Sequence, residues 1–287
     1  MNSEPKIWSS SDFPYQCLLD IRRTTALQAA INAVVREGDI VVDAGAGSGI
    51  LSFFAARAGA KQVYAVEVDP SLAECLRRSV VANGFEQVIT VVSGDVHGAE
   101  LPEPADVFIC EMMDTGLMDE MQVTAINALR KRGILTVDTR MVPFQYETFL
   151  EFGYTDFSYY GYKLLVPKHQ WPHYANGNNG WLDTSFDAVS KPLALGTVDF
   201  RDIVVPDVHV QLSLQPDRAG LVNAVRVSAR THLVPGMMLG ATNALNGDKI
   251  VPLGEELHLE PGRRLQVDVR YLMGGGLDSL KILLREA

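Results

Sequence analysis

Hydrophobic and polar residues divide the chain into two parts with different periodicities. Up to about residue 142, apolar runs such as 105–110 alternate with segments whose apolar residues recur every three to four positions, the spacing of an amphipathic helix. Beyond that point the helical spacing nearly disappears. Apolar and polar residues instead alternate one by one at 208–214, 225–231 and 265–271, which is typical of half-buried antiparallel strands.

The first part predicts an open, mainly parallel α/β sheet, and the second an antiparallel sandwich or barrel with turns at the Pro-Gly pairs 235 and 261. Helices are expected at 16–36, 50–58, 70–83 and 121–130, and strands at 62–66, 88–92, 105–110 and 134–137, besides one that begins at Ile40. We therefore predict a Rossmann-like domain with an N-terminal helix over 1–142. A β-barrel-like domain for substrate binding or dimerisation is predicted over 143–287.

The sequence IVVDAGAGSG places the strand that begins at Ile40 directly before a glycine-rich turn. Gly45, Gly47 and Gly49 let the backbone approach a ligand without clashes from Cβ atoms. The helix and strand that follow complete a unit that binds nucleotide-like ligands. Glu67 ends the second strand, where a carboxylate can accept hydrogen bonds from both hydroxyls of a ribose.

Two classes of cofactor use this arrangement of strand, turn and helix. The dinucleotide fingerprint is G-x-G-x-x-G, whereas the glycines here follow G-x-G-x-G. Asp43 lies two residues before the first glycine, where a carboxylate can meet the positively charged α-ammonium group of S-adenosylmethionine. The pattern therefore favours S-adenosylmethionine, and a dinucleotide-dependent oxidoreductase is the alternative that the spacing disfavours.

Composition narrows the classes of partner. The 287 residues include 35 acids and 25 bases, a formal net charge of -10, with no block of Lys or Arg, so the protein's field repels nucleic acid and suits cationic substrates. Cys17, Cys75 and Cys110 have neither disulfide-like nor metal-ligand spacing, which indicates reduced thiols and no metal site. Without a signal peptide or an apolar run of about 20 residues, we expect a cytoplasmic protein that does not bind membranes.

The stretch VVDAGAGSGILSFFAARAGAKQVYAVE resembles the cofactor motif of class I methyltransferases, most closely that of the protein arginine methyltransferases. The upstream LLDIRRT is similar to a helix segment of that family, so the resemblance implies that Arg23 holds the cofactor carboxylate; a solvated helix face is the alternative. The resemblance also implies that Glu67 binds the ribose. The turn of Gly94, Asp95 and Val96 would then lie against the adenine.

Two glutamates, Glu111 and Glu120, bound the loop EMMDTGLMDE directly after the strand 105–110, whose end faces the ligand crevice of an open α/β sheet. This spacing resembles the double-glutamate loop of arginine methyltransferases. A guanidinium is delocalised and always protonated, so its nitrogen attacks a methyl sulfonium only when its charge is localised. Two carboxylates can do this with bidentate hydrogen bonds, and one can take the released proton. Acids placed by chance in an exposed loop are the alternative.

Two features depart from the pattern of the family. Met112, Met113 and Asp114 follow the first glutamate, where the family has Trp, Met and Gly. The family's Thr-His-Trp barrel loop has no counterpart before 249–253. Its place is taken by Ala244, Leu245 and Asn246, of which Asn246, like Asn243, offers a polar contact but no base. No motif links the histidines to the site: His97, His169, His173, His209, His232 and His258 stay unassigned.

The resemblance implies methylation of a guanidino nitrogen. The changed barrel loop and the compact size favour free arginine or a related small molecule, and a protein arginine methyltransferase is the alternative. Because part of the family's catalytic set is missing, a subunit that holds the cofactor without transferring the methyl group is a further alternative, against which the glutamate pair argues. The aromatic-rich stretch 152–181 is a candidate for a substrate lid, the arm of a homodimer or core packing.

Overall fold

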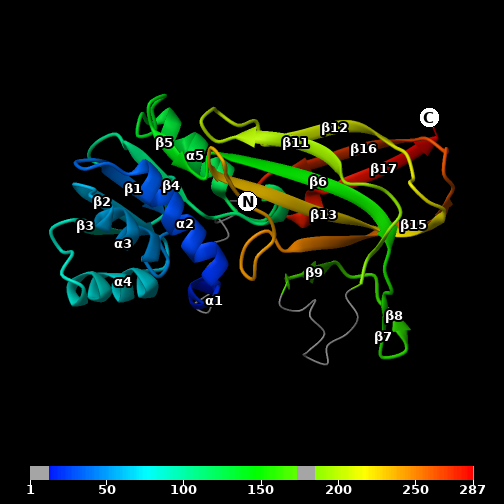
Figure 1. Cartoon of the computed structure of the whole chain (residues 1–287), viewed down its shortest axis with the longest axis horizontal. Coiled ribbons are helices and arrows are strands. Elements are labelled where there is room, and N and C mark those ends of the chain that lie inside the picture. The colour runs from blue at the N-terminus through cyan, green and yellow to red at the C-terminus, as the bar shows by residue number, and fades with distance from the viewer. Residues whose placement is uncertain (1–12, 173–184, 287) are drawn as a thin grey trace, which may run out of the picture.

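A computed structural model describes residues 13–172 and 185–286 and joins an α/β part to an antiparallel β part (Figure 1). The first sheet has five parallel strands in the order β3-β2-β1-β4-β5. They are β1 (Ile40–Ala44), β2 (Gln62–Glu67), β3 (Ile89–Ser93), β4 (Val107–Cys110) and β5 (Arg140–Val142). Because the strand order reverses between β1 and β4, their carboxyl ends border the crevice in which such sheets bind ligands.

Helices on the two faces of this sheet explain why β1 and β4 are buried at every position. They are α1 (Phe13–Leu19), α2 (Ile21–Val34), α3 (Ile50–Arg57), α4 (Pro70–Ala82) and α5 (Gln122–Lys131), with a short 3-10 turn, η1 (Thr115–Leu117), before α5. The single helix predicted over 16–36 is interrupted at Asp20. This residue caps α2 instead, because its carboxylate accepts a hydrogen bond from the backbone N–H of Arg23 at 3.0 Å.

The strand predicted at 134–137 is wrong, because that segment closes α5. Gly133 adopts a positive φ of 74°, and the N–H of Ile134 donates back to the carbonyl of Leu129 at 3.0 Å. The apolar side chain of Ile134 is therefore buried against the helix end without a partner strand. The fifth strand begins only at Arg140, after a turn.

Antiparallel strands make up the rest of the described chain. A seven-stranded sheet follows the order β10-β6-β13-β15-β9, with β11 also paired to β6 and β14 to β13, and β12-β16-β17 form a three-stranded sheet. The strands are β6 (Gln145–Tyr154), β9 (Lys168–Gln170), β10 (Asp187–Ala188), β11 (Leu193–Asp199), β12 (Asp207–Leu214), β13 (Gly220–Val234), β14 (Met237–Leu239), β15 (Asp248–Leu259), β16 (Leu265–Leu272) and β17 (Lys281–Glu286); a 3-10 turn, η2 (Leu277–Ser279), precedes β17. The predicted fold class, a Rossmann-like α/β sheet followed by antiparallel sheets, is confirmed.

One cluster of buried apolar side chains continues from the parallel sheet into the antiparallel part, through residues such as Val142, Tyr146 and Val225. The parallel sheet ends at Val142 and the first antiparallel strand begins at Gln145. The division into two domains at residue 142 stays a prediction.

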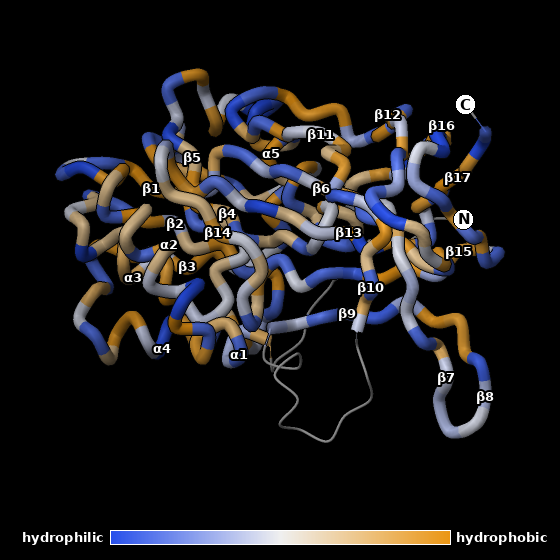
Figure 2. Tube along the Cα trace, turned by 45° about the vertical axis from the view of Figure 1, so that its right-hand side comes forward, coloured by the Kyte–Doolittle hydropathy of each residue, from blue (hydrophilic) through white to orange (hydrophobic). Residues whose placement is uncertain are grey.

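A small hairpin of β7 (Ser158–Tyr159) and β8 (Tyr162–Lys163) stands away from the body of the molecule in both views (Figures 1 and 2). It comes from the aromatic-rich stretch 152–181. Phe152 and Phe157 of that stretch are buried and serve as packing, whereas Tyr160 at the hairpin tip is 88% exposed. The part of the stretch from residue 173 onward, with His173, lies outside the described residues.

Candidate active site

The glycine-rich turn lies at the carboxyl end of β1. Gly45, Gly47 and Gly49 adopt φ values of 72°, 54° and 81°, which side chains with a Cβ rarely tolerate. A Cβ on Gly45 would lie 2.6 Å from Cγ of Met112, and one on Gly49 would overlap Leu76 of α4. The turn is therefore packed closely against both the loop after β4 and the helix after β2.

Glu67 supports this turn from the end of β2. One carboxylate oxygen accepts the N–H of Gly47 at 2.7 Å, and the other accepts the N–H of Asp69 at 2.8 Å. The side chain is buried, at 6% exposure. Each carboxylate oxygen has more than one lone-pair direction, so Glu67 keeps the capacity to accept hydroxyl donors from a ligand.

Asp43 is the buried penultimate residue of β1 and accepts a 2.6 Å hydrogen bond from the hydroxyl of Ser52 in α3. Burial raises the pKa of Asp43 to about 6, although the hydrogen bond from Ser52 opposes the shift. Within residues 13–172 and 185–286 no cation forms an ion pair with this carboxylate. A cationic ligand group would lower its pKa and remove the cost of its burial.

Arg23, from the first turn of α2, meets Glu111, which directly follows β4. The Arg23 Nη2 and a Glu111 carboxylate oxygen form an ion pair, and the two side chains are 5% and 6% exposed. Burial lowers the pKa of Arg23. The Nε and Nη1 atoms of the same guanidinium are buried and have no hydrogen-bond partner among the described residues. Two buried donors beside Glu111 are therefore available to a ligand.

The turn after β3 holds Asp95 and Val96. Val96 is buried, whereas the Asp95 side chain is half exposed and accepts hydrogen bonds from the backbone N–H of His97 at 2.9 Å and from its Nδ1 at 2.6 Å. His97 also contacts the hydroxyl of Thr124 in α5 at 2.9 Å. His97, unassigned from the sequence, thus ties the turn to the helix that follows the second glutamate.

Glu120 lies at the far end of the loop from Glu111, just before α5. Its backbone N–H donates to a carboxylate oxygen of Asp114 at 3.1 Å. Although part of the residue reaches solvent, burial of the carboxyl raises the pKa of Glu120 to about 8, with a further rise from the charge of Asp114. Lys249 and Arg23 act in the opposite direction. Glu120 is therefore mostly protonated at neutral pH when no ligand is bound.

Several residues that sequence reasoning missed hold this loop. Lys249 of β15 forms ion pairs with Asp114 and with Asp119, the latter at 2.6 Å. The hydroxyl of Tyr146 donates to the carbonyl of Asp114 at 3.1 Å. At the other end, the side-chain oxygen of Gln122 accepts the N–H of Met112 at 3.0 Å, while its buried amide nitrogen has no partner in the part of the chain that the structure describes.

Comparisons with known proteins agree with this geometry. The family model of the TRM5/TYW2 methyltransferase domain matches residues 22–142. Over 270 residues the chain is 30% identical to an uncharacterized protein of Methanocaldococcus jannaschii, covering 94% of this chain and 95% of that one. It is 45% identical over 129 residues to a probable histone-arginine methyltransferase 1.3 of Arabidopsis thaliana, covering 44% of this chain and 24% of that one.

A further relative is an arginine N(omega)-methyltransferase of Streptomyces achromogenes, 36% identical over 133 residues, which cover 45% of this chain and 37% of that one. Among solved structures, the Trypanosoma brucei PRMT1 enzyme-prozyme heterotetrameric complex with AdoHcy matches with a TM-score of 0.74 at 20% identity, over 95% of this chain and 96% of that one. The chain belongs to the class I S-adenosylmethionine-dependent methyltransferases. Within this class the methyltransferase resembles the protein arginine methyltransferases, as its cofactor motif predicts.

The residues around the glycine turn fit S-adenosylmethionine group by group. The unpartnered nitrogens of Arg23 suit a carboxylate, the buried and unpaired Asp43 suits an ammonium group, and Glu67 at the end of β2 suits ribose hydroxyls. Asp95 and Val96 lie on the turn after the neighbouring strand β3. The class establishes the cofactor, and the role of each residue stays a prediction.

The barrel loop in which the family has a histidine is built differently in this methyltransferase. The backbone N–H of Ala244 donates to the Asp20 carboxylate at 2.7 Å, so the loop still contacts the start of α2. Asn246 is buried and its amide donates to the hydroxyl of Thr231 at 2.9 Å. Neither Ala244 nor Asn246 supplies a base.

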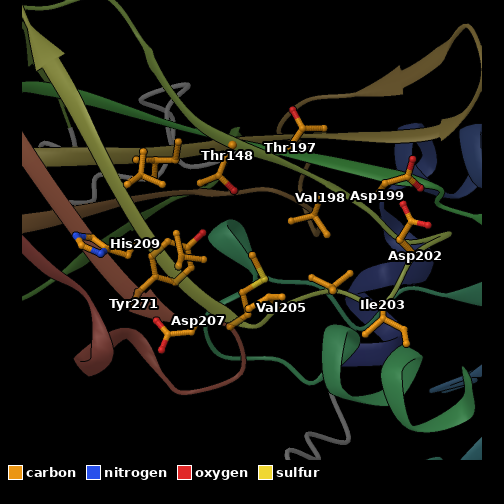
Figure 3. Close-up of a pocket in the computed structure, with 16 residues that line it drawn as sticks. Thr148, Thr197, Val198, Asp199, Asp202, Ile203, Val205, Asp207, His209 and Tyr271 are labelled. Carbon is orange, nitrogen blue, oxygen red and sulfur yellow. The ribbon is translucent and has the colours of Figure 1, made fainter. Parts of the chain in front are cut away.

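A cavity of about 460 Å³ lies in the antiparallel part of the methyltransferase, between β11, β12 and β16 (Figure 3). Asp199, Asp202, Asp207 and exposed apolar residues such as Ile203 line it, and none of its lining residues belongs to the glycine turn or the double-glutamate loop. Among the described residues no group of three or more His, Cys, Asp or Glu side chains is arranged to hold a metal ion. None of the helices described is both long and apolar enough to cross a membrane.

Proposed function

We propose that this methyltransferase methylates a guanidino nitrogen of arginine, with free arginine or a related small molecule as the favoured substrate. The observation that carries the proposal is the pair Glu111 and Glu120. Glu111 directly follows β4 and is buried against Arg23, and Glu120 ends the same loop just before α5, with its pKa raised to about 8. Arg23 pairs with Glu111 and its charge also acts on Glu120, so one cation links the two acids.

The two glutamates can divide the chemistry between them. S-adenosylmethionine supplies a methyl group on a sulfonium, which a neutral nitrogen lone pair can attack. Glu111, held by Arg23, is an ionised acceptor for two guanidinium N–H groups. Glu120 loses its proton when a cation binds beside it, and its carboxylate then accepts the proton that the attacking nitrogen releases.

The net charge of the protein, its barrel loop and two related proteins support the choice of substrate. The net charge of -10 favours a cationic acceptor, and the short barrel loop at 244–246 lacks the family's histidine and tryptophan. The related Streptomyces protein is named an arginine N(omega)-methyltransferase, and the related plant protein a probable histone-arginine methyltransferase. Transfer to an arginine in a protein or peptide is therefore the second candidate.

The alternative without transfer is a subunit that only binds the cofactor. The ion pair of Arg23 with Glu111 and the raised pKa of Glu120 support catalysis. A subunit that only binds the cofactor does not need a second acid that lacks an ion-pair partner of its own. The missing barrel histidine is the feature that favours the alternative.

A homodimer is part of the same proposal. The β7–β8 hairpin exposes Tyr160 and Tyr162, the segment directly after it exposes Leu165, and α1 exposes Tyr15 and Leu19. Large exposed apolar side chains gathered on a projecting hairpin are typical of contact surfaces. Light scattering on the wild type and on Tyr160→Asp tests this: a dimer that becomes a monomer supports the contact, and a monomeric wild type rejects it.

Incubation with labelled S-adenosylmethionine and a panel of acceptors tests the function. The panel contains free arginine, other guanidines, arginine peptides and cell extract, and Glu120→Gln serves as the inactive control. Label on free arginine or a small guanidine supports the favoured substrate, and label only on peptides or extract proteins supports the second candidate. Binding of the cofactor without label on any acceptor supports the binding subunit.

A further inference from the structure

We propose that Lys249 is a positioning residue of this site: from β15 it holds the Glu120 end of the double-glutamate loop through Asp114 and Asp119 and places its positive charge beside the Glu120 carboxyl. The inference rests on the proposed function for its kinetic consequence, but not for its electrostatic one. Lys249 lies outside the motifs of the sequence, on a strand about 130 residues further along the chain.

The geometry starts at the ammonium group of Lys249. Its Nζ donates to Oδ2 of Asp114 and, at 2.6 Å, to Oδ2 of Asp119. The other oxygen of Asp114 accepts the backbone N–H groups of Asp119 at 2.9 Å and Glu120 at 3.1 Å. The lysine is thus two hydrogen bonds away from the backbone of Glu120, through a carboxylate that it orients itself.

The strand that carries Lys249 is rigidly placed. Lys249 pairs with Val227 of β13 on one side and with His169 of β9 on the other. The carbonyl of Gly247, directly before β15, accepts the hydroxyl of Thr115 at 2.7 Å, so the loop is held a second time at the start of this strand. A tether from the middle of a sheet restricts the loop more than a tether from an exposed side chain would.

Because Lys249 is buried, its charge must be matched by its ion-pair partners. Lys249 is 1% exposed, and a lysine taken out of water is tolerated only when its charge is matched. Asp114 and Asp119 together carry more negative charge than the lysine neutralises. Burial raises the pKa of Asp114, whereas the hydrogen bond and the charge of Lys249 outweigh burial at Asp119 and lower its pKa.

The titratable groups that face Glu120 come from six elements. Asp114 and Asp119 belong to its own loop, and the others are Lys249 of β15, Arg23 of α2, Cys17 of α1, Cys110 of β4 and Tyr146 of β6. The two aspartates favour the neutral form of Glu120, and the two cations favour its carboxylate. His169 of β9 faces Lys249 and the two aspartates, and its own pKa is lowered by burial and by the lysine. Arg23 is paired with Glu111, so Lys249 is the cation that can be replaced without breaking that ion pair.

Substitution of Lys249 by Met removes the charge of the side chain and keeps much of its shape. In Lys249→Met the pKa of Glu120, followed by carbon NMR of labelled glutamate side chains and assigned with Glu120→Gln, is expected to rise by about 1 pH unit or more. The pKa of His169 is expected to rise as well, which reports that the charge has gone. In Lys249→Met/Asp114→Asn the carboxamide keeps the loop hydrogen bonds and the charges balance, so the Glu120 pKa is expected to return close to its wild-type value.

Kinetic measurements then show how much Lys249 contributes to methyl transfer. We expect kcat/KM to fall at least about tenfold in Lys249→Met, with the pH at half-maximal rate moved upward together with the Glu120 pKa. Lys191→Met, at an 84% exposed lysine, is the matched control and should change neither quantity. Asp119→Asn removes the negative charge from one arm of the tether, at a partly exposed side chain, and serves if Lys249→Met fails to fold. With this ion pair weakened, the rate should fall and the fold should stay intact.

The two proposals fail in different ways. An unchanged Glu120 pKa in folded Lys249→Met, or in Asp119→Asn an unchanged kcat/KM, overturns the role of Lys249. The NMR titration needs no substrate, so a shifted Glu120 pKa supports that role even if the wild type methylates no guanidine. In that case the proposed function alone is rejected.

Discussion

The donor side and the acceptor side of the site are built in different ways. The donor side is local: Asp43, the glycine turn and Glu67 lie within 25 consecutive residues, and Glu67 hydrogen-bonds directly to Gly47. The acceptor side is assembled across the fold, because the loop between the two glutamates is held by Tyr146 and Lys249 of the antiparallel sheet. The donor is thus specified by a motif, whereas the acceptor depends on packing between the two parts of the chain.

Loss of a glutamate on the methyl-acceptor side should have the largest effect, which is on the rate of methyl transfer. Glu120→Gln keeps the shape of the side chain but can neither attract a guanidinium nor take a proton, so we expect methyl transfer to fall at least about 100-fold. The dissociation constant of the cofactor should stay nearly unchanged. Single-turnover rates and calorimetry measure the two quantities. Full turnover in the variant would reject the guanidinium clamp.

Glu111→Gln should stop methyl transfer as well, but its effects on transfer and on cofactor binding are harder to separate. Its partner Arg23 keeps a buried positive charge that has lost its counter-ion, so a moderate change in cofactor affinity is expected alongside the loss of rate. Comparison of the two glutamine variants by calorimetry therefore measures how far the donor and acceptor sides share Arg23. Equal cofactor affinities would show that the ion pair does not couple them.

Loss of an acid on the methyl-donor side should mainly weaken the binding of the cofactor. Glu67→Ala removes the carboxylate that supports Gly47 and that we assign to the ribose, so the cofactor should bind about tenfold to 100-fold more weakly. Glu74→Ala, at a half-exposed side chain on α4, is the matched control. An unchanged dissociation constant in Glu67→Ala would remove Glu67 from the cofactor site.

Protonation of Glu120 gives a pH dependence with a definite sign. Its pKa is raised from an ordinary value of 4.5 to about 8, so the free enzyme carries the proton at pH 7. Binding of a guanidinium favours the carboxylate and should release about one proton, and affinity should increase as the pH rises toward 8. Calorimetry in buffers of different ionisation enthalpy counts the protons. Binding without proton release would place the cation away from Glu120.

The smallest effect distinguishes the two cofactor classes. A ligand that binds only the native state stabilises it by about 2.7 kcal/mol at 100 times its dissociation constant, which raises Tm by several degrees. S-adenosylmethionine should do this and NAD should not. The opposite result would favour the dinucleotide alternative that the G-x-G-x-G spacing disfavours.

Most of the fold and the glycine turn were predictable from the sequence, for physical reasons that differ by element. Most of the expected helices and strands of the first part follow their periodicity, and the turn is encoded by glycines that adopt positive φ. The strand expected at 134–137 failed because Ile134 and Leu135 pack as a helix end. At the break, the Asp20 carboxylate caps α2 through the N–H of Arg23. It also accepts the N–H of Ala244, 224 positions away, a contact that no sequence pattern shows.

The acceptor side was only half predictable. Glu111 and Glu120 stand out because they bound a loop after a buried strand, whereas nothing local marks Lys249, Tyr146 or Gln122 as their supports. A lysine within a strand segment is an ordinary solvent-facing residue until the fold buries it between two aspartates. Charged residues of this kind are found only when the tertiary contacts are known.

The central claim is that the two glutamates direct the donor's methyl group onto a guanidino nitrogen. Mass spectrometry of the product formed with methyl-deuterated S-adenosylmethionine and free arginine tests it most directly. A trideuteromethyl group on a guanidino nitrogen, formed by the wild type and absent with Glu120→Gln, is the predicted result. A labelled product whose methyl group lies on another atom, or one that Glu120→Gln forms equally well, would contradict it.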